Sequence, residues 1–400
     1  MNSPESQRMT ASELRASAAL ASIFALRLLG LFMILPVFAI HARGLPGGDN
    51  GFLVGLALGI YGLAQAMLHL PLGAASDRFG RKPVIVAGLA TFALGSFLGA
   101  VSTTVTGVVV ARAIQGAGAI SAAVTAFIAD STRDSQRTKA MAMVGGSIGV
   151  TFALSLVGAP ALYAVVGMDG LFEITGVLAL AAIAVVVFVV PAAPAQPAPS
   201  IRSRLRDVAL DGDMLRLNFG IFTLHAVQLA MFAVVPRWLI ERAGMPVADH
   251  WKLYLGVVVA SFAVMVPPMI WGERHGKLRP VFLGSIVLIA GVSALLTLQP
   301  SGLVPLTVLL FGFFAGFNIL EAVLPSVVSR LAPPDAKGAA LGLYNTTQAL
   351  GLFAGGALGG WLQARFGGAA VFGVCTALLV VWLGLAAGQR RWPAARAGRG

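Results

Sequence analysis

The chain has 400 residues, of which 58% are hydrophobic and 11% are charged, and its formal net charge is +12. Soluble domains carry about 25% charged residues, so this composition excludes an ordinary water-soluble globule and indicates a helical protein that crosses the bilayer many times. A single cysteine, Cys375, excludes disulfides and cysteine metal sites. The basic charge would suggest nucleic acid in a soluble chain, but here its position matters more, and we expect lipid and no nucleic acid as a partner.

Apolar runs of the roughly 20 residues that a membrane helix needs recur along the whole chain. The first run is too long for a cleaved signal peptide and is predicted to be retained as a helix. Six spans are predicted in the first half, at about 17–40, 52–73, 84–103, 106–130, 140–163 and 168–190. Six more are predicted at about 214–236, 251–271, 281–298, 303–328, 338–364 and 369–388.

A segment rich in proline and arginine separates the two sets of spans. Its prolines favour extended chain, and Arg202, Arg204 and Arg206 favour the anionic cytoplasmic surface. We therefore expect an N-terminal six-helix bundle over residues 1–190, a cytoplasmic linker over 191–213, and a C-terminal six-helix bundle with a short basic tail over 214–400.

The basic residues gather on one side of this layout. With a cytoplasmic N-terminus, 21 of the 28 Lys and Arg residues lie in cytoplasmic segments, five lie on the other side, and Arg27 and Arg112 lie within spans. This asymmetry predicts that both termini are cytoplasmic.

Two loops repeat about 198 residues apart. The segment from Asp77 to Pro83 reappears from Glu273 to Pro280 with one residue inserted, and residues 137–141 face 335–339. Halves repeated in the same sense are typical of transporters with a pathway between two bundles.

The first of these loops, residues 73–83, places one acid and three bases between two predicted spans. Gly80 suits a sharp turn and Pro83 suits the first position of the next helix. An ordinary basic loop is the alternative interpretation. The order of residues resembles the signature loop between the second and third helices of the major facilitator superfamily. Further stretches resemble its YajR-type bacterial inner-membrane transporters, which are themselves similar to proton-driven drug exporters, namely 26–36, 59–65, 112–119, 137–142 and 317–325.

The resemblance implies an all-α membrane protein with twelve transmembrane helices in two six-helix bundles, working as a monomer. It also implies a gating charge relay in which Asp77 docks on the start of the eleventh helix near Gly338 and Ala339 and favours the outward-open state. The alternative is that the acids of the relay only cap helix ends. The residues of the relay are Gly73, Asp77, Arg78, Gly80, Arg81, Lys82 and Asp130.

Ionisable residues within the bilayer are costly and usually functional. Glu321 is the only acid well inside a span of the second half, and we predict that it carries the proton, with Arg112 as modulator and His225 in reserve. The alternatives are a structural hydrogen bond for Glu321 and a satisfied buried imidazole for His225. The stretch from Arg112 to Gln115 resembles the superfamily motif linked to proton coupling, and Arg27 is a further charge deep in the first span.

Polar side chains along apolar spans indicate a substrate path between the halves, although aromatic and polar residues of such helices also serve packing. The candidates are Tyr61, Gln65, Asn318, Asn345 and Gln348. Glycine pairs at four-residue spacing predict close helix contacts, at 55/59, 95/99, 312/316 and 356/360.

Residues 145–149 match the G-x-S-x-G pattern of hydrolases, but that motif needs a strand-turn-helix, whereas Ser147 lies in a predicted span. No metal-spaced His/Cys cluster and no phosphate loop occurs, so we expect neither an enzyme nor a cofactor. We expect a secondary active transporter that exports small, lipophilic compounds in exchange for protons. The exporter motif of the fifth helix is incomplete, so proton-linked uptake of a metabolite is the alternative, and a membrane sensor without transport is a second.

Overall fold

The computed structural model of the protein describes residues 9–191, 208–333 and 336–393, and these contain helices and no strand. The helices are α1 (Ala11–His41), η2 (Ala42–Gly44), α2 (Gly51–Phe79), α3 (Arg81–Ala100), α4 (Val105–Ala117), α5 (Ser121–Ser131), α6 (Asp134–Phe188), α8 (Gly212–Glu241), η3 (Val247–Asp249), α9 (His250–Arg274), α10 (Leu278–Leu296), α11 (Leu303–Leu331) and α12 (Lys337–Ala387). The predicted all-α fold class is confirmed. Most of the predicted linker, including Arg202, Arg204 and Arg206, lies outside the described residues. So does Asp335, the first residue of the repeated segment 335–339.

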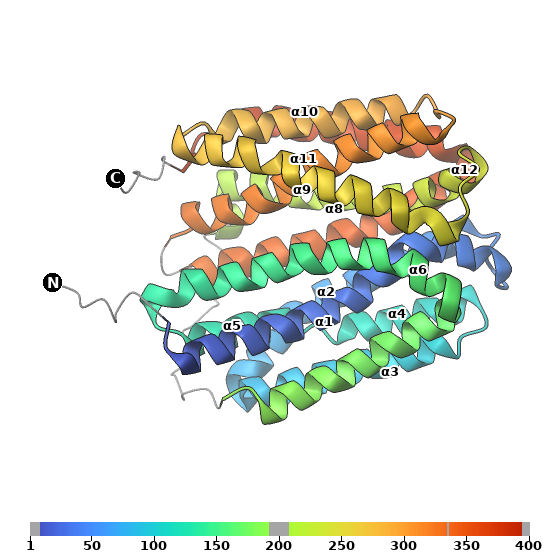
Figure 1. The fold of residues 1–400 in the computed structure, drawn as a ribbon. Coiled ribbons are helices and arrows are strands. Elements are labelled where there is room, and N and C mark those ends of the chain that lie inside the picture. The colour runs from blue at the N-terminus through green and yellow to red at the C-terminus, as the bar shows by residue number, and fades with distance from the viewer. Residues whose placement is uncertain (1–8, 192–207, 334–335, 394–400) are drawn as a thin grey trace.

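Ten helices in the described part of the chain are long and apolar enough to cross a membrane. Two of them, α6 with 55 residues and α12 with 51, would measure about 75 Å or more if straight, over twice the roughly 30 Å of a hydrocarbon core. Each is broken by a glycine with positive φ, Gly167 (φ 68°) and Gly367 (φ 78°), at the boundaries predicted from the sequence. Figure 1 shows α6 turning back there, which supports the predicted twelve crossings.

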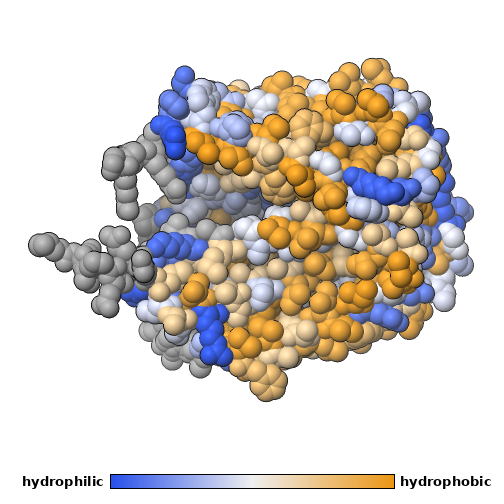
Figure 2. Space-filling view, in the orientation of Figure 1, coloured by the Kyte–Doolittle hydropathy of each residue, from blue (hydrophilic) through white to orange (hydrophobic). Residues whose placement is uncertain are grey.

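The helices run side by side between two ends of the molecule (Figure 1). We call the end where α1 begins and α12 finishes the terminal face, and the other end the opposite face. On the side that Figure 2 shows, hydrophobic residues cover most of the middle of the surface, and most hydrophilic residues lie toward the two faces. This belt is what a bilayer requires of the surface that it contacts.

The two halves are packed together toward the opposite face. The parts of the first half near this face, including Met33, Phe38 and Val105, share one hydrophobic core with α8–α12. Near the terminal face, by contrast, residues such as Leu20, Val84 and Ile128 form a separate core that contains first-half residues only. The hydrophobic core is therefore continuous between the two halves at the opposite face.

Helices α2 and α12 form the closest seam between the halves. A Cβ added at Gly55 would lie 2.1 Å from the Gly356 carbonyl oxygen, and one at Gly62 would lie 2.3 Å from that of Ala349. Near the same end, Arg43 Nη1 lies 3.0 Å from Glu241 Oε1. On the terminal-face side of α12, a Cβ at Gly338 or Gly342 would meet no atom within 4 Å. The predicted glycine contacts at 55/59 and 356/360 are confirmed.

The span predicted at 106–130 agrees with the membrane-length segment Val105–Ser131, within which the helix is interrupted between α4 and α5. Gly118, at the interruption, packs so closely on α3 that a Cβ would lie 2.4 Å from the Gly88 carbonyl oxygen. One local expectation is wrong. Pro83 occupies the third position of α3 rather than the first. Its missing N–H still falls in the first turn, where the helix needs none.

The repeat between the halves extends to backbone conformation. Gly80 joins α2 to α3 with φ 94°, and Gly276 follows α9 with φ 65°. Both values lie in the region that favours glycine. Residues with side chains would be strained at both turns, so these glycines set how the two loops reverse.

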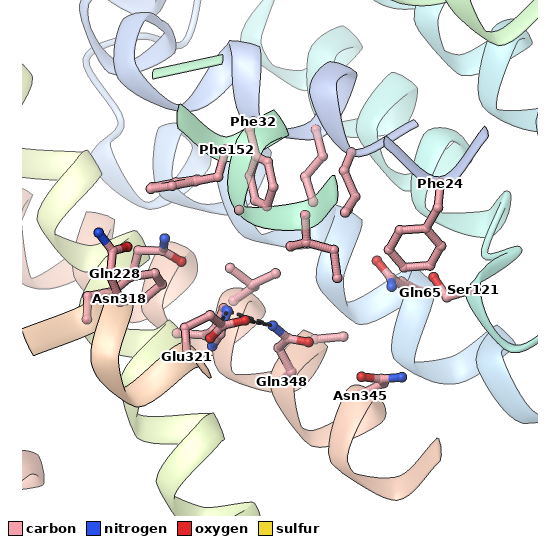
Figure 3. Close-up of a pocket in the computed structure, with 18 of the residues that line it drawn as sticks. Phe24, Phe32, Gln65, Ser121, Phe152, Gln228, Asn318, Glu321, Asn345 and Gln348 are labelled. Carbon is pink, nitrogen blue, oxygen red and sulfur yellow. Dashed lines mark hydrogen bonds and ion pairs between the residues drawn. The ribbon is translucent and has the colours of Figure 1, made fainter. Parts of the chain in front are cut away.

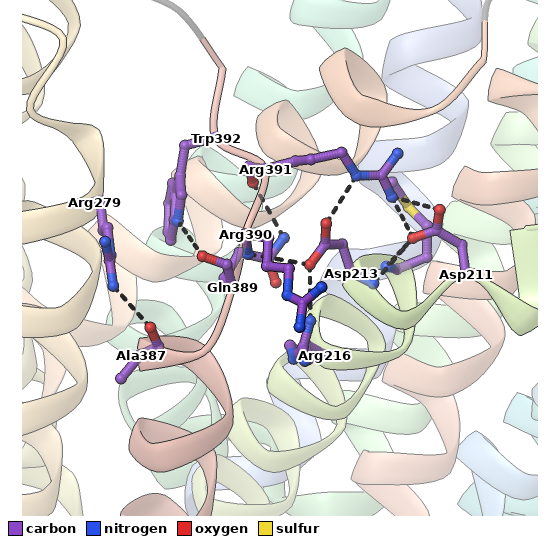
Figure 4. A network of polar contacts seen from close by, with 10 residues as sticks. Asp211, Asp213, Arg216, Arg279, Ala387, Gln389, Arg390, Arg391 and Trp392 are labelled. Atoms are coloured by element: carbon purple, nitrogen blue, oxygen red, sulfur yellow. Dashed lines mark hydrogen bonds and ion pairs between the residues drawn. The ribbon is translucent and has the colours of Figure 1, made fainter.

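The C-terminal segment is fastened to the start of α8 (Figure 4). Arg391 Nε lies 2.7 Å from Asp213 Oδ2, and the same guanidinium also bonds Asp211, the N-cap of α8. The Trp392 ring packs on Phe282 with centroids 5.4 Å apart. These contacts hold Arg391 and Trp392 beside the beginning of the second half.

Candidate functional site

A central cavity lies between the halves (Figure 3), and its space together with the open solvent at its entrance amounts to about 780 Å³. Helices α1, α2, α5 and α6 form one wall, and α8, α11 and α12 form the other. The lining residues are Phe24, Leu28, Leu31, Phe32, Gln65, His69, Ser121, Ile148, Gly149, Phe152, His225, Gln228, Phe317, Asn318, Glu321, Asn345, Gln348, Ala349 and Leu352. Apolar surface with few polar groups is typical of a small-molecule site.

Glu321 is the only acidic residue of this lining, and it meets two polar partners (Figure 3). Gln348 Nε2 donates to Glu321 Oε1 at 3.4 Å, and His225 Nε2 lies 3.7 Å from Glu321 Oε2. Gln348 Nε2 also lies 2.7 Å from His225 Nε2. The Ile221 carbonyl, 3.2 Å from His225 Nδ1, can only accept. Nδ1 therefore carries the hydrogen, and Nε2 accepts from Gln348.

The α8–α12 wall also presents acceptors without donors. Glu321 Oε2 and Gln228 Oε1 are buried and have no hydrogen-bond partner among the described residues. Asn318, by contrast, is engaged, because its Nδ2 donates to Ser261 Oγ at 2.9 Å. Two acceptors of this wall thus stay available to a ligand or a proton.

The facing wall carries Gln65, His69 and Ser121. Arg27 lies behind it, and its Nη1 donates to Ser121 Oγ at 2.8 Å. His69 is buried, and neither ring nitrogen has a partner within the described part of the chain. The prediction of Gln65 in the cavity agrees with this geometry, whereas His69 and Ser121 were missed.

Tyr61 does not line the cavity, contrary to the prediction. Its ring is buried beneath two guanidinium groups, with Arg112 Cζ 4.9 Å and Arg27 Cζ 5.6 Å from its centroid. Arg112 Nη1 donates to Gln115 Oε1 at 2.9 Å, and Gln115 Nε2 donates to Ser96 Oγ at 2.8 Å. The two arginines and Gln115 thus belong to the interior of the first half, one layer behind the cavity wall.

The charge cluster at the terminal face brings together three of the predicted relay residues. Arg81 bonds Asp77 one turn away on α2, and its Nε lies 2.8 Å from Asp130 Oδ2 at the end of α5. Arg78 instead stacks on Phe79 at 5.2 Å, and Lys82 bonds the Val190 carbonyl. A Cβ at Gly73 would contact Ala122 at 3.4 Å, so α2 and α5 are close here.

The docking of Asp77 on the start of α12 is not among the contacts of the described residues. In this conformation Asp77 bonds Arg81, and the first turn of α12 is uncovered at Gly338. The halves meet at the opposite face instead. The docking of Asp77 therefore stays a prediction for a state in which the terminal face closes.

The G-x-S-x-G pattern has no catalytic geometry. Ser147 lies inside α6, and its hydroxyl donates to the Val144 carbonyl at 2.7 Å in the manner of helical serines. The described residues contain no group of three His, Cys, Asp or Glu side chains that could hold a metal ion.

Membrane-length helices in two halves around a central cavity, mostly apolar with a few polar groups, define a membrane transporter. A family model described as Major Facilitator Superfamily matches residues 18–355 and 253–396, and the chain therefore belongs to this superfamily. Its relatives are multi-pass membrane transporters, not enzymes.

Among relatives, the inner membrane transport protein YajR of Escherichia coli K12 is 40% identical over 390 residues, covering 96% of this chain and 86% of its own length. The multidrug resistance protein MdtH of Aeromonas salmonicida is 26% identical, with 84% of each chain covered. A crystal structure of a bacterial homologue of the human lysosomal transporter Spinster, in an inward-facing and occupied conformation, aligns with a TM-score of 0.77 at 12% identity. It covers 97% of this chain and all of the other, which shows a shared fold.

Proposed function

We propose that the protein is a secondary active transporter that exports small, lipophilic compounds in exchange for protons by alternating access. The observation that carries this proposal is the central cavity, which both halves line and which the α2–α12 seam closes toward one face only. Rocking the halves about such a site exposes it to each side of the membrane in turn.

The excess of basic residues favours the terminal face as the cytoplasmic one. This structure would then be the inward-open state, with the glycine seam sealing the cavity from the periplasm. In the outward-open state the seam would part, and Asp77 would dock on the start of α12 near Gly338 while Arg81 and Asp130 keep it in position. Both termini would be cytoplasmic.

Glu321 is the proposed proton carrier. It is the acid of the cavity lining, and its Oε2 has no hydrogen-bond partner in the described part of the chain. Taking up a proton neutralises a charge that would otherwise cross the apolar interior, which lowers the cost of the rocking step. Gln348 donates a hydrogen bond to the other oxygen, Oε1. His225 Nε2 lies 3.7 Å from Glu321 Oε2 and is the proposed second acceptor of the proton.

Arg112 is the proposed modulator. It lies in the first half and bonds Gln115, so it acts on the helix packing around Tyr61 rather than on the proton itself. Each proton that moves inward supplies about 2.3 kcal/mol per 100 mV of membrane potential. Export is favoured over uptake because MdtH, a relative of this chain, is named for multidrug resistance.

The test combines a substrate screen with proton flux. Overexpressing and deletion cells are compared for tolerance and accumulation, and each hit is added to inside-out vesicles that carry a pH-sensitive dye. Antiport predicts proton release from the acidified lumen, whereas uptake by symport predicts the reverse sign. Glu321→Gln should reduce this flux at least about tenfold. Glu173→Gln, at an exposed position of α6, is the control, and undiminished coupling in Glu321→Gln would rule out Glu321 as the carrier.

A further inference from the structure

The two walls of the cavity differ in hydrogen-bonding character, and this difference selects among ligands. On the α1/α2/α5/α6 wall, Ser121 Oγ already accepts from Arg27 Nη1 at 2.8 Å. A hydroxyl has one hydrogen, which must then point away from the guanidinium. No acceptor for that hydrogen is present among the described contacts, so Ser121 offers a donor to the cavity.

His69 offers a second donor on the same wall. Its side chain is 2% exposed and lines the cavity, and neither ring nitrogen has a partner in the described structure. At least one of these nitrogens always carries a hydrogen. Leaving a buried donor without a hydrogen bond costs free energy. A ligand with an acceptor atom at this position would therefore be favoured.

The positive charges behind this wall also favour a ligand with a negative group. Arg27 and Arg112 are 1% and 0% exposed, and neither forms an ion pair with a carboxylate among the described residues. Buried cations without counterions attract negative groups strongly, because little water screens them. The two guanidinium groups lie behind one wall of the cavity, and the single carboxylate of the lining, that of Glu321, lies on the other wall.

The rest of the cavity suits an apolar body. Aromatic rings from both halves form its sides, with the Phe32 and Phe152 centroids 5.1 Å apart and those of Phe152 and Phe317 5.9 Å apart. Such walls bind hydrocarbon and give it no polar partner. The acceptor atoms, Glu321 Oε2 and Gln228 Oε1, lie on the α8–α12 wall.

We infer that the cavity takes amphiphilic organic anions, with the acidic group of the ligand held by Ser121 and His69 in front of Arg27. Its apolar body would lie between the phenylalanine rings. This inference rests on the proposed function, because it assigns a substrate class to the same transport cavity. Glu321 then serves the proton and not the ligand, which keeps the two binding events on opposite walls.

The test uses three probes with one apolar body: 4-phenylbutyrate, 4-phenylbutan-1-ol and 4-phenylbutylammonium. Binding to the purified full-length protein is measured by calorimetry without any proton gradient. The carboxylate should bind about tenfold or more tightly than the alcohol, as charge-assisted hydrogen bonds predict. Ser121→Ala and His69→Phe should each weaken the carboxylate about tenfold and the alcohol by less, since a neutral hydroxyl loses a weaker hydrogen bond.

Two further variants separate binding from folding and from proton coupling. His69→Gln keeps an N–H donor and should restore most of the carboxylate affinity, which a packing role would not produce. Glu321→Gln should remove proton flux without weakening carboxylate binding, because the change takes a negative charge out of the cavity. The inference is overturned if the carboxylate binds no better than the alcohol, if the ammonium probe binds most tightly, or if Ser121→Ala and His69→Phe both bind the carboxylate as the wild type does. The proposed function can still hold in each case, since proton-coupled flux is measured separately.

Discussion

If the protein works by the proposed alternating access, the seam between α2 and α12 should make the equilibrium between its two states sensitive to one methyl group. A Cβ at Gly356 would lie 2.6 Å from the Gly55 carbonyl oxygen, 2.7 Å from Gly59 N and 2.8 Å from Gly59 Cα. All three are backbone atoms, so no side chain can rotate away, and the helices must separate. Overpacking of this kind costs about 1–3 kcal/mol, which shifts an equilibrium by roughly 5- to 150-fold.

Gly356→Ala should therefore disfavour the state that is closed at the opposite face. The assay replaces the buried Cys375 by serine, introduces Gln65→Cys in the cavity, and measures labelling by a membrane-impermeant maleimide from the side of the opposite face. The rate should rise by a factor within that roughly 5- to 150-fold range. Gly342→Ala, on the same helix, is the matched control, because its Cβ would meet no atom within 4 Å.

Equal labelling of the Gly356→Ala and Gly342→Ala variants would refute this reasoning, since the seam would then not control access. A fall in the melting temperature of Gly356→Ala without faster labelling would also count against it. In that case the glycines would only hold the fold together.

Three further outcomes are expected. Asp77→Asn should abolish export at normal membrane expression, because an amide neither holds Arg81 as an ion pair nor docks as an anion on the start of α12. Normal export by this variant would contradict the predicted docking of Asp77. Asp211→Ala should lower thermal stability by about 1–2 kcal/mol, since this residue caps α8 and bonds Arg391. Burial raises the pKa of Asp211, but hydrogen bonds from the Met214 N–H and Arg391 outweigh this and leave it below the ordinary value. The stabilisation is therefore present above about pH 4 and should disappear as the pH falls below that, so a difference between variant and wild type that persists in acid would contradict it. Ser147→Ala should leave export unchanged in the same cell assay, because its hydroxyl bonds only carbonyl oxygens within the fold; a loss of export would reopen a catalytic role.

Two cavity residues that the sequence analysis did not identify could have been found from their helical spacing. His69 follows Gln65 by four residues and Gln228 follows His225 by three, so each pair shares one helix face. Ser121 carried no such signal. It lines the cavity at the first position of α5, next to the interruption between α4 and α5, where Gly118 packs closely against α3.

The sequence by itself determined the helices, because a span must satisfy its own backbone within an apolar environment and this requirement is local. It also determined the repeated loops, the reversals at Gly167 and Gly367, and Glu321 as the acid within the second half. Only the tertiary structure decided that Tyr61 lies behind the cavity, that Arg27 donates to Ser121, and that the halves meet at the opposite face. Those features depend on which helices are neighbours, and small residues far apart in the chain set that by letting backbones approach.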